Sequence, residues 1–185
     1  MNKPEFDAIK NKHGLGRLKL HSSNRVIGNF ISNNRQTHYE IPDFQREYVW
    51  TDIQASRFIE SLLLELPIGT IVLTANSDDY YEETGCSHIV IDGSQRLRSL
   101  WRFVNNEFAL QGCNILSELN GLKWNDFDKH MKFVFETIGI SVTTFSSMDR
   151  EILDHNLILN IFKNINTGGT QITNTQMDNA IEKLS

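Results

Sequence analysis

A strand that passes directly into a helix, between residues 88 and 104, restricts the folds open to this chain. The segment HIVID at 88–92 is rich in β-branched side chains, which is typical of a buried strand. Gly93 follows at once and permits the sharp turn that a strand-to-helix junction needs. Apolar residues then recur at i, i+3, i+4 and i+7, the spacing of one helix face, at Leu97, Leu100, Trp101 and Val104. The pattern predicts a domain in which helices pack on a sheet.

The rest of the chain continues this alternation of strands and helices. Thr51 and Gln54 carry the sequence signature of a capping box and predict a helix that ends before Pro67. Further strands are expected at 15–20, 39–41, 70–74, 107–110 and 138–145. Further helices are expected at 127–135, from about residue 149, and from a second capping box at Thr173 and Gln176, with a polar loop at 77–87. The predicted fold class is α+β, a small mixed sheet packed with helices.

The length of 185 residues suits one domain. Residues 1–38 are polar and weakly periodic, so we expect an N-terminal extension there and the domain itself over residues 39–185. The apolar stripe of the last predicted helix ends at Leu184. We expect this stripe to be covered by its own domain, by a partner, or by a further C-terminal region.

Composition excludes several classes of protein. The formal net charge of −5 argues against a protein that coats nucleic acid, because such binding needs a basic surface. Two cysteines are too few for a disulfide framework. The N-terminus has no signal-peptide core, and no apolar run approaches the roughly 18 residues of a membrane span. We therefore expect a cytoplasmic protein without a membrane partner.

Arg96 occupies an unusual position, the first turns of the helix that follows Asp92 and Gly93. We expect Asp92 to be the N-cap and Gln95 its capping-box partner. A helix N-terminus favours anions by about 0.3–1 kcal/mol, so a cation there is mildly unfavourable. A bound phosphate would reverse that sign, since backbone amides and the guanidinium would then face the same anion. The alternative is that the arginines of this helix pair with carboxylates.

Three other segments favour the same interpretation. Gln45 and Arg46 follow a strand that Pro42 ends, and Tyr48 and Trp50 beside them suit either base stacking or core packing. Arg98 and Arg102 lie on a polar stripe of the helix and are candidates for contacts with DNA phosphates. The segment NTGGT contributes consecutive glycines whose amides suit an anion-binding nest, or alternatively a helix C-cap, at Asn166, Thr167, Gly168, Gly169 and Thr170.

These segments, in this order, resemble the N-terminal domain of GmrSD-type restriction endonucleases. The similarity rests on IPDFQREYVW, IVIDGSQRLRSL and FKNINTGGTQITNTQMDNAI, and it spans residues 39–182. The resemblance implies membership of the ParB/sulfiredoxin-like superfamily, with an α+β fold. It also implies a nucleotide (NTP)-handling role, with Mg²⁺ as a further expected cofactor, in defence against modified phage DNA.

The resemblance also assigns roles to residues. The family's D-G-Q-Q-R motif, linked with nucleotide hydrolysis, aligns with Asp92, Gly93, Ser94, Gln95 and Arg96. We expect Asp92, Gln95 and Arg96 to be catalytic. Gly93 and Ser94 are expected to bind phosphate, as are Gln45, Arg46 and residues 166–170. Ser94 replaces a glutamine of the motif and Arg98 replaces a small polar residue, so binding is expected to persist while hydrolysis is in doubt.

The nuclease half of the family is absent from this sequence, so we expect a separate nuclease subunit or a missing C-terminal domain as a partner. The six histidines have no metal-ligand spacing, and no metal site is assigned. Two other classes of function stay open. One is a non-enzymatic DNA-binding or assembly module. The other is thiol chemistry at Cys86, in the segment GCSH.

Overall fold

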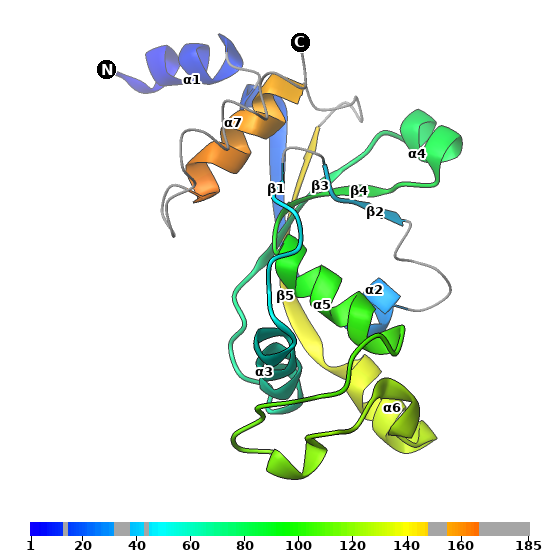
Figure 1. Ribbon diagram of the computed structural model, residues 1–185. Helices are drawn as coiled ribbons and strands as arrows, with labels where there is room; N and C mark the ends of the chain where they lie inside the picture. The colour runs from blue at the N-terminus through cyan, green and yellow to red at the C-terminus, as the bar shows by residue number, and fades with distance from the viewer. Residues whose placement is uncertain (13–14, 32–37, 43–44, 148–154, 167–185) are drawn as a thin grey trace.

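The computed structural model describes residues 1–12, 15–31, 38–42, 45–147 and 155–166 (Figure 1). The strands of this part of the chain form one mixed sheet, in the order β1-β5-β3-β4-β2. Neighbours β3 and β5 are parallel, as are β2 and β4, whereas the β1–β5 and β3–β4 pairs are antiparallel. The strand bounds are β1 (Leu18–Val26), β2 (Tyr39–Glu40), β3 (Ile71–Ala75), β4 (His88–Asp92) and β5 (Gly139–Ser147). The predicted α+β class, a mixed sheet with helices, is confirmed.

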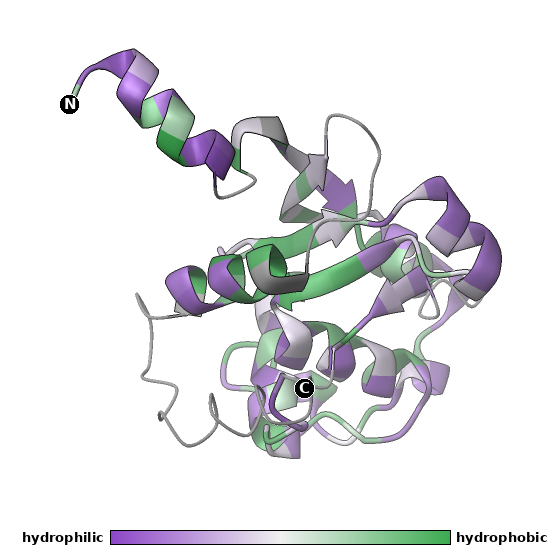
Figure 2. Ribbon diagram, turned by 90° about the horizontal axis from the view of Figure 1, so that it is seen from above, coloured by the Kyte–Doolittle hydropathy of each residue, from purple (hydrophilic) through white to green (hydrophobic). Residues whose placement is uncertain are grey.

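Helices cover both faces of the sheet. On one face lie α2 (Gly28–Ile31), α3 (Asp52–Leu63), α5 (Ser94–Val104) and α6 (Lys129–Thr137), and on the other lies α7 (His155–Asn166). The helix α1 (Lys3–Lys12) stands away from the sheet and α4 (Asp78–Thr84) lies beyond its end (Figures 1 and 2). Short 3₁₀ turns occur at Leu15–Arg17, Ser117–Leu119 and Trp124–Asp126. No described helix is long and apolar enough to cross a bilayer.

The alternation of side chains between the two faces of the sheet divides the core into two clusters. Successive side chains of a strand point to opposite faces, so Ile71 and Leu73 join the cluster under α3 and α5 while Val72 joins the cluster under α7. The α7 cluster is completed by Ile91 and by three helix residues, Leu157, Ile158 and Ile161. The central strands are thus buried on both faces, which explains their continuous apolar sequence.

The predicted domain boundary at residue 38 is wrong. β1 pairs with β5 over its whole length, from Leu18 opposite Ser147 to Val26 opposite Gly139. Ile27 and Phe30 are completely buried in the core beneath the helices. Only α1, which has no buried residue, fits the description of an extension. β1 is an edge strand with few core contacts, so most of its side chains are polar and its sequence lacks the apolar alternation that predicts a strand.

The structure confirms one of the other predicted elements and corrects two. The capping box is confirmed, since Gln54 N donates to Thr51 Oγ1 (3.3 Å) and Thr51 N donates to Gln54 Oε1 (2.9 Å). The predicted loop at 77–87 is instead the helix α4, which Ser77 caps. Residues 107–110 form no strand, because Glu107 N donates back to the Arg102 carbonyl and Leu110 alone of the four exchanges main-chain hydrogen bonds with residues 121–122. The capping box at Thr173 and Gln176 lies outside the described residues.

A buried carboxylate on α3 holds the loop that precedes α6. Glu60 is 6% exposed, and its two oxygens accept hydrogen bonds from the backbone amides of Asn114, Ile115 and Leu116 at 2.7–3.2 Å. Burial alone would raise the pKa of this carboxyl. The three amides and the nearby Arg57 outweigh that effect, so the pKa of Glu60 is lowered.

Replacement Glu60→Gln is expected to destabilise the protein by about 2 kcal/mol at pH 7, because the new amide nitrogen would face a backbone donor. The pKa of Glu60 is lower in the folded state, so its contribution is complete above the unfolded pKa and is lost as pH falls through the folded pKa. The difference from native protein should therefore shrink in acid. Urea unfolding at pH 7 and pH 3 measures it, with the exposed Glu82→Gln as control. Equal stability of both variants at pH 7 would contradict this role.

Candidate functional site

The turn between β4 and α5 differs from its predicted form. Gly93 is the N-cap of α5 with φ of 96°, and no side chain caps the helix. Asp92 is the last residue of β4 and not the N-cap, so the predicted capping box with Gln95 is wrong. The left-handed conformation at Gly93 swings the Asp92 side chain away from the helix amides, and its carboxylate contacts Arg96 instead. The first amides of α5 are left without a side-chain cap.

The Arg96 guanidinium points into the protein. Nη1 donates to the Ile68 carbonyl (2.8 Å), and Nη2 donates to the Thr70 carbonyl (3.1 Å) and to Asp92 Oδ2 (2.8 Å). The side chain is only 14% exposed. Burial lowers the pKa of Arg96, while the Asp92 carboxylate opposes that shift. This placement contradicts the expectation that Arg96 faces a phosphate, and the alternative of a carboxylate pair is confirmed.

Two glycines make room for this guanidinium. A Cβ atom at Gly69 would lie 3.1 Å from Arg96 Nη1, and one at Gly93 would lie 3.3 Å from Nη2. Both glycines also have positive φ, which side chains rarely adopt. From the sequence, Gly69 was expected only to end the preceding helix together with Pro67, and neither it nor the carbonyls beside it were expected at the site. The signal was the segment PIGT just before β3, where a glycine follows the end of α3.

Two glutamines fasten the segment 45–50 to the end of β4 and to α5. Gln45 Nε2 donates to the carbonyls of Val90 and of Ile91, the latter at 3.3 Å. Gln95 Oε1 accepts from the Val49 amide (2.9 Å), and its Nε2 donates to the Glu47 carbonyl (3.0 Å). Both side chains are buried. Because both ends of the Gln95 amide are occupied, the predicted catalytic role of Gln95 is not supported; it positions the segment that carries Arg46.

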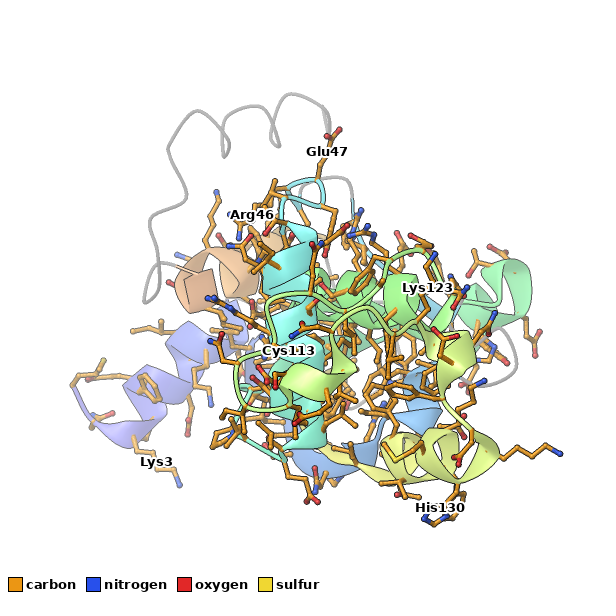
Figure 3. All side chains as sticks on the ribbon, turned by 60° about the horizontal axis from the view of Figure 1, so that its bottom comes forward. Lys3, Arg46, Glu47, Cys113, Lys123 and His130 are labelled. Carbon is orange, nitrogen blue, oxygen red and sulfur yellow. The ribbon has the colours of Figure 1, made fainter. Side chains whose placement is uncertain are left out.

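The four arginines of this region divide into paired and unpaired groups. Arg102 contacts Asp52 (3.0 Å), Glu107 (3.3 Å) and the Tyr48 ring (4.8 Å to its centroid). These contacts occupy its guanidinium, so the predicted contact of Arg102 with DNA is not supported. Arg46 is exposed beside Glu47 near the start of α3 (Figure 3), and it has no ion pair within the described residues. Arg98 is partly buried, and its Nε has no hydrogen-bond partner there. Arg46 and Arg98 are therefore the arginines of this region that form no ion pair within the described residues.

Tyr48 and Trp50 pack internally. The Tyr48 hydroxyl lies 2.8 Å from Ser99 Oγ, and the Trp50 ring contacts Phe58 edge-on with 5.8 Å between centroids. The packing interpretation is therefore confirmed for both aromatics, and they form no stacking platform for a base. Ser94 is buried, at 8% exposed, and occupies the first position of α5.

The remaining predicted residues lie elsewhere. Asn166 is the last residue of α7, and Thr167 to Thr170 lie outside the described residues. Cys86 is buried, and burial raises the pKa of its thiol, so the described geometry does not favour thiolate chemistry there. Among the described residues, no group of three or more histidine, cysteine, aspartate or glutamate side chains has the arrangement of a metal site.

Replacement Arg96→Ala is expected to destabilise the protein by about 2 kcal/mol, because it leaves Asp92 and two loop carbonyls without their donor. Arg96→Lys should recover only part of this loss, since one ammonium cannot reproduce the planar fork. Chemical unfolding of both variants measures the effect, with Lys19→Ala, at an exposed residue of β1, as control. An Arg96→Ala protein as stable as the control would show that the pairing is incidental.

Comparison with protein families finds a match, described as "GmrSD restriction endonuclease, N-terminal domain", over residues 27–181. The match begins at Ile27, within the segment that joins β1 to α2, and so agrees with the inclusion of α2 in the domain. No curated protein and no solved structure matches the chain. Because the match covers most of the sequence, this chain belongs to the family of GmrSD restriction endonuclease N-terminal domains.

Proposed function

We propose that this domain binds a nucleoside triphosphate and regulates a modification-dependent restriction system in the cytoplasm. Family membership makes it a component of a restriction or phage-defence system and implies a nuclease partner domain or subunit. The observation that carries nucleotide binding is a pair of arginines, Arg46 and Arg98, that form no ion pair within the described residues and lie near a helix start that no side chain caps.

The helix start supplies the neutral part of the site. The amides of Ser94, Gln95 and Arg96 stand in the first turn of an eleven-residue helix, and the first intrahelical donor after Gly93 is Leu97. Such amides and the helix dipole favour a phosphate oxygen. The Arg96 pair keeps the turn rigid, so these donors are already oriented before a ligand arrives.

The two arginines supply the charge. Gln45 is bound to the carbonyls at the end of β4, so its neighbour Arg46 is held close to the β4–α5 turn. Arg98 lies one turn further along α5. Arg98 is partly buried, and a partly buried cation without a carboxylate is costly. A phosphate would offset that cost through charge-assisted hydrogen bonds.

Asp92 is the residue that suits Mg²⁺. Its Oδ2 is taken by Arg96, whereas no hydrogen bond to its Oδ1 occurs within the described residues, and the side chain is 36% exposed. One carboxylate together with phosphate oxygens is a common set of Mg²⁺ ligands. The residues expected to drive hydrolysis, Gln95 and Arg96, are engaged internally. We therefore propose binding and regulation, with the segment 167–170 as a further predicted phosphate contact.

Replacement of Arg46 or Arg98 by alanine is expected to weaken nucleotide affinity about tenfold, the loss of one charge-assisted contact of roughly 1.4 kcal/mol or more. Calorimetric titration with ATP, GTP, CTP and UTP, each with Mg²⁺, measures the affinity. Thermal unfolding of each variant checks that the fold is intact.

Arg57→Ala is the matched control, because Arg57 is an exposed arginine of the adjacent helix α3 outside the proposed site. The proposal fails if no nucleotide binds the native protein, or if Arg46→Ala and Arg98→Ala both bind like the control. Retention of duplex DNA by native protein, lost in the Arg98→Ala variant and declining steeply with salt, would instead favour the DNA-binding alternative.

A further inference from the structure

The strand β1 forms one edge of the sheet, and we call its unpaired side the β1 edge, residues 18–26. β1 stands first in the order β1-β5-β3-β4-β2 and pairs with β5 over all nine of its residues. Apart from this ladder, the described part of the chain makes no main-chain hydrogen bond to residues 19–26. Alternate residues of β1 therefore direct their amide and carbonyl groups away from the sheet. Such an edge is a template for another strand.

The register with β5 determines which side chains of β1 share a face. Residues directly opposite one another in an antiparallel pair lie on the same face. Arg25 is opposite Ile140, which belongs to the core under α5, so the odd-numbered residues of β1 lie on that face. Leu18 packs against the cluster under α7, so the even-numbered residues lie on the opposite face.

The odd-numbered face of the β1 edge is basic. It carries Lys19 and His21, which are exposed, and Arg25, which is partly exposed. Arg25 Nη2 donates to the neutral Thr144 Oγ1 at 3.4 Å. Neither Lys19 nor Arg25 has an ion pair within the described part of the chain. The residues opposite this row on β5 are not acidic: Ser146, Thr144 and Ile140.

The even-numbered face of the β1 edge is apolar towards its ends. Leu20 is 62% exposed and Val26 is 41% exposed, and both share a face with Leu18. A strand added beside β1 would cover these side chains best with apolar residues at alternate positions. On its other face the same strand would meet the basic row, where carboxylates give favourable cross-strand pairs. The two faces together therefore specify an occupant in which acidic and apolar residues alternate.

The charges of the β1 edge disfavour a second copy of this chain as the occupant. Two β1 strands paired antiparallel along their whole length would place Lys19 of each copy opposite Arg25 of the other. Like charges directly opposite one another are destabilising. Nucleic acid would match the basic row, but its phosphates only accept hydrogen bonds and would leave the outward carbonyls unpaired. A peptide main chain supplies both donors and acceptors.

We propose that the β1 edge binds an extended protein segment in which acidic and apolar residues alternate, added to the sheet as a further strand. Main-chain hydrogen bonds to the outward amides and carbonyls supply affinity, and Lys19 and Arg25 select carboxylates on one face. β1 shares no residue with the β4–α5 turn. The proposal is therefore independent of nucleotide binding, and either can fail alone.

Binding of a synthetic peptide tests the proposal. The probe is a nine-residue peptide of alternating valine and glutamate, blocked at both ends and labelled with a fluorophore, and fluorescence anisotropy measures its affinity for the protein. Lys19→Glu and His21→Glu should each weaken binding about fivefold, because an attractive or neutral cross-strand pair becomes repulsive. Lys3→Glu of α1 is the control, since it changes the charge of an exposed lysine away from the β1 edge and should bind like native protein (Figure 3).

Hydrogen exchange distinguishes strand addition from attraction by charge alone. Saturation with the peptide should slow amide exchange in residues 18–26 about tenfold, because the outward amides gain acceptors. Circular dichroism of each variant checks that the fold is preserved. The proposal is overturned if native protein does not bind the peptide, if both edge variants bind like the control, or if binding leaves exchange in β1 unchanged. It is also overturned if native protein binds a twelve-base-pair DNA duplex through Lys19 in place of the peptide.

Discussion

The hydrogen-bonded guanidinium of Arg96 holds together the part of the molecule on which the candidate site depends. It joins the loop before β3 to the junction of β4 and α5, and these two segments are 26 to 28 residues apart in sequence. The pair joins Asp92, the last residue of β4, to Arg96 in the first turn of α5. Burial would be costly for either ion alone, so the loop carbonyls and both glycines are needed to complete the arrangement.

Glutamine amides extend this framework to the segment 45–50. An amide both donates and accepts, so Gln95 can bind two backbone groups of the same extended segment, as a pairing strand would. Gln45 makes the reciprocal attachment to the end of β4. The motif residues that were expected to be catalytic, Gln95 and Arg96, therefore hold the backbone around the site in place. Arg46 and Arg98 are the arginines that we propose bind the ligand.

The basic side chains around the β4–α5 turn differ in how their charge is neutralised. The charge of Arg96 is neutralised by Asp92, whereas Arg46 and Arg98 form no ion pair within the described residues. In a chain with a net charge of −5, two such arginines near one helix start favour local recognition of phosphate over general attraction to nucleic acid.

Patterns within one element were sufficient to predict most strands and helices. The capping box at Thr51 and the apolar stripe of α5 depend only on neighbours in sequence, and both were found correctly. The edge strand β1 was underestimated and α4 was missed, because neither buries a periodic apolar face. The family too was accessible, since its motifs are contiguous segments. The orientation of Arg96 could not be predicted from the sequence, because its acceptors at residues 68 and 70 are brought near it only by folding. Which arginines are neutralised and which are left for a ligand is therefore decided by tertiary contacts, where carbonyls and carboxylates from distant segments compete for each guanidinium.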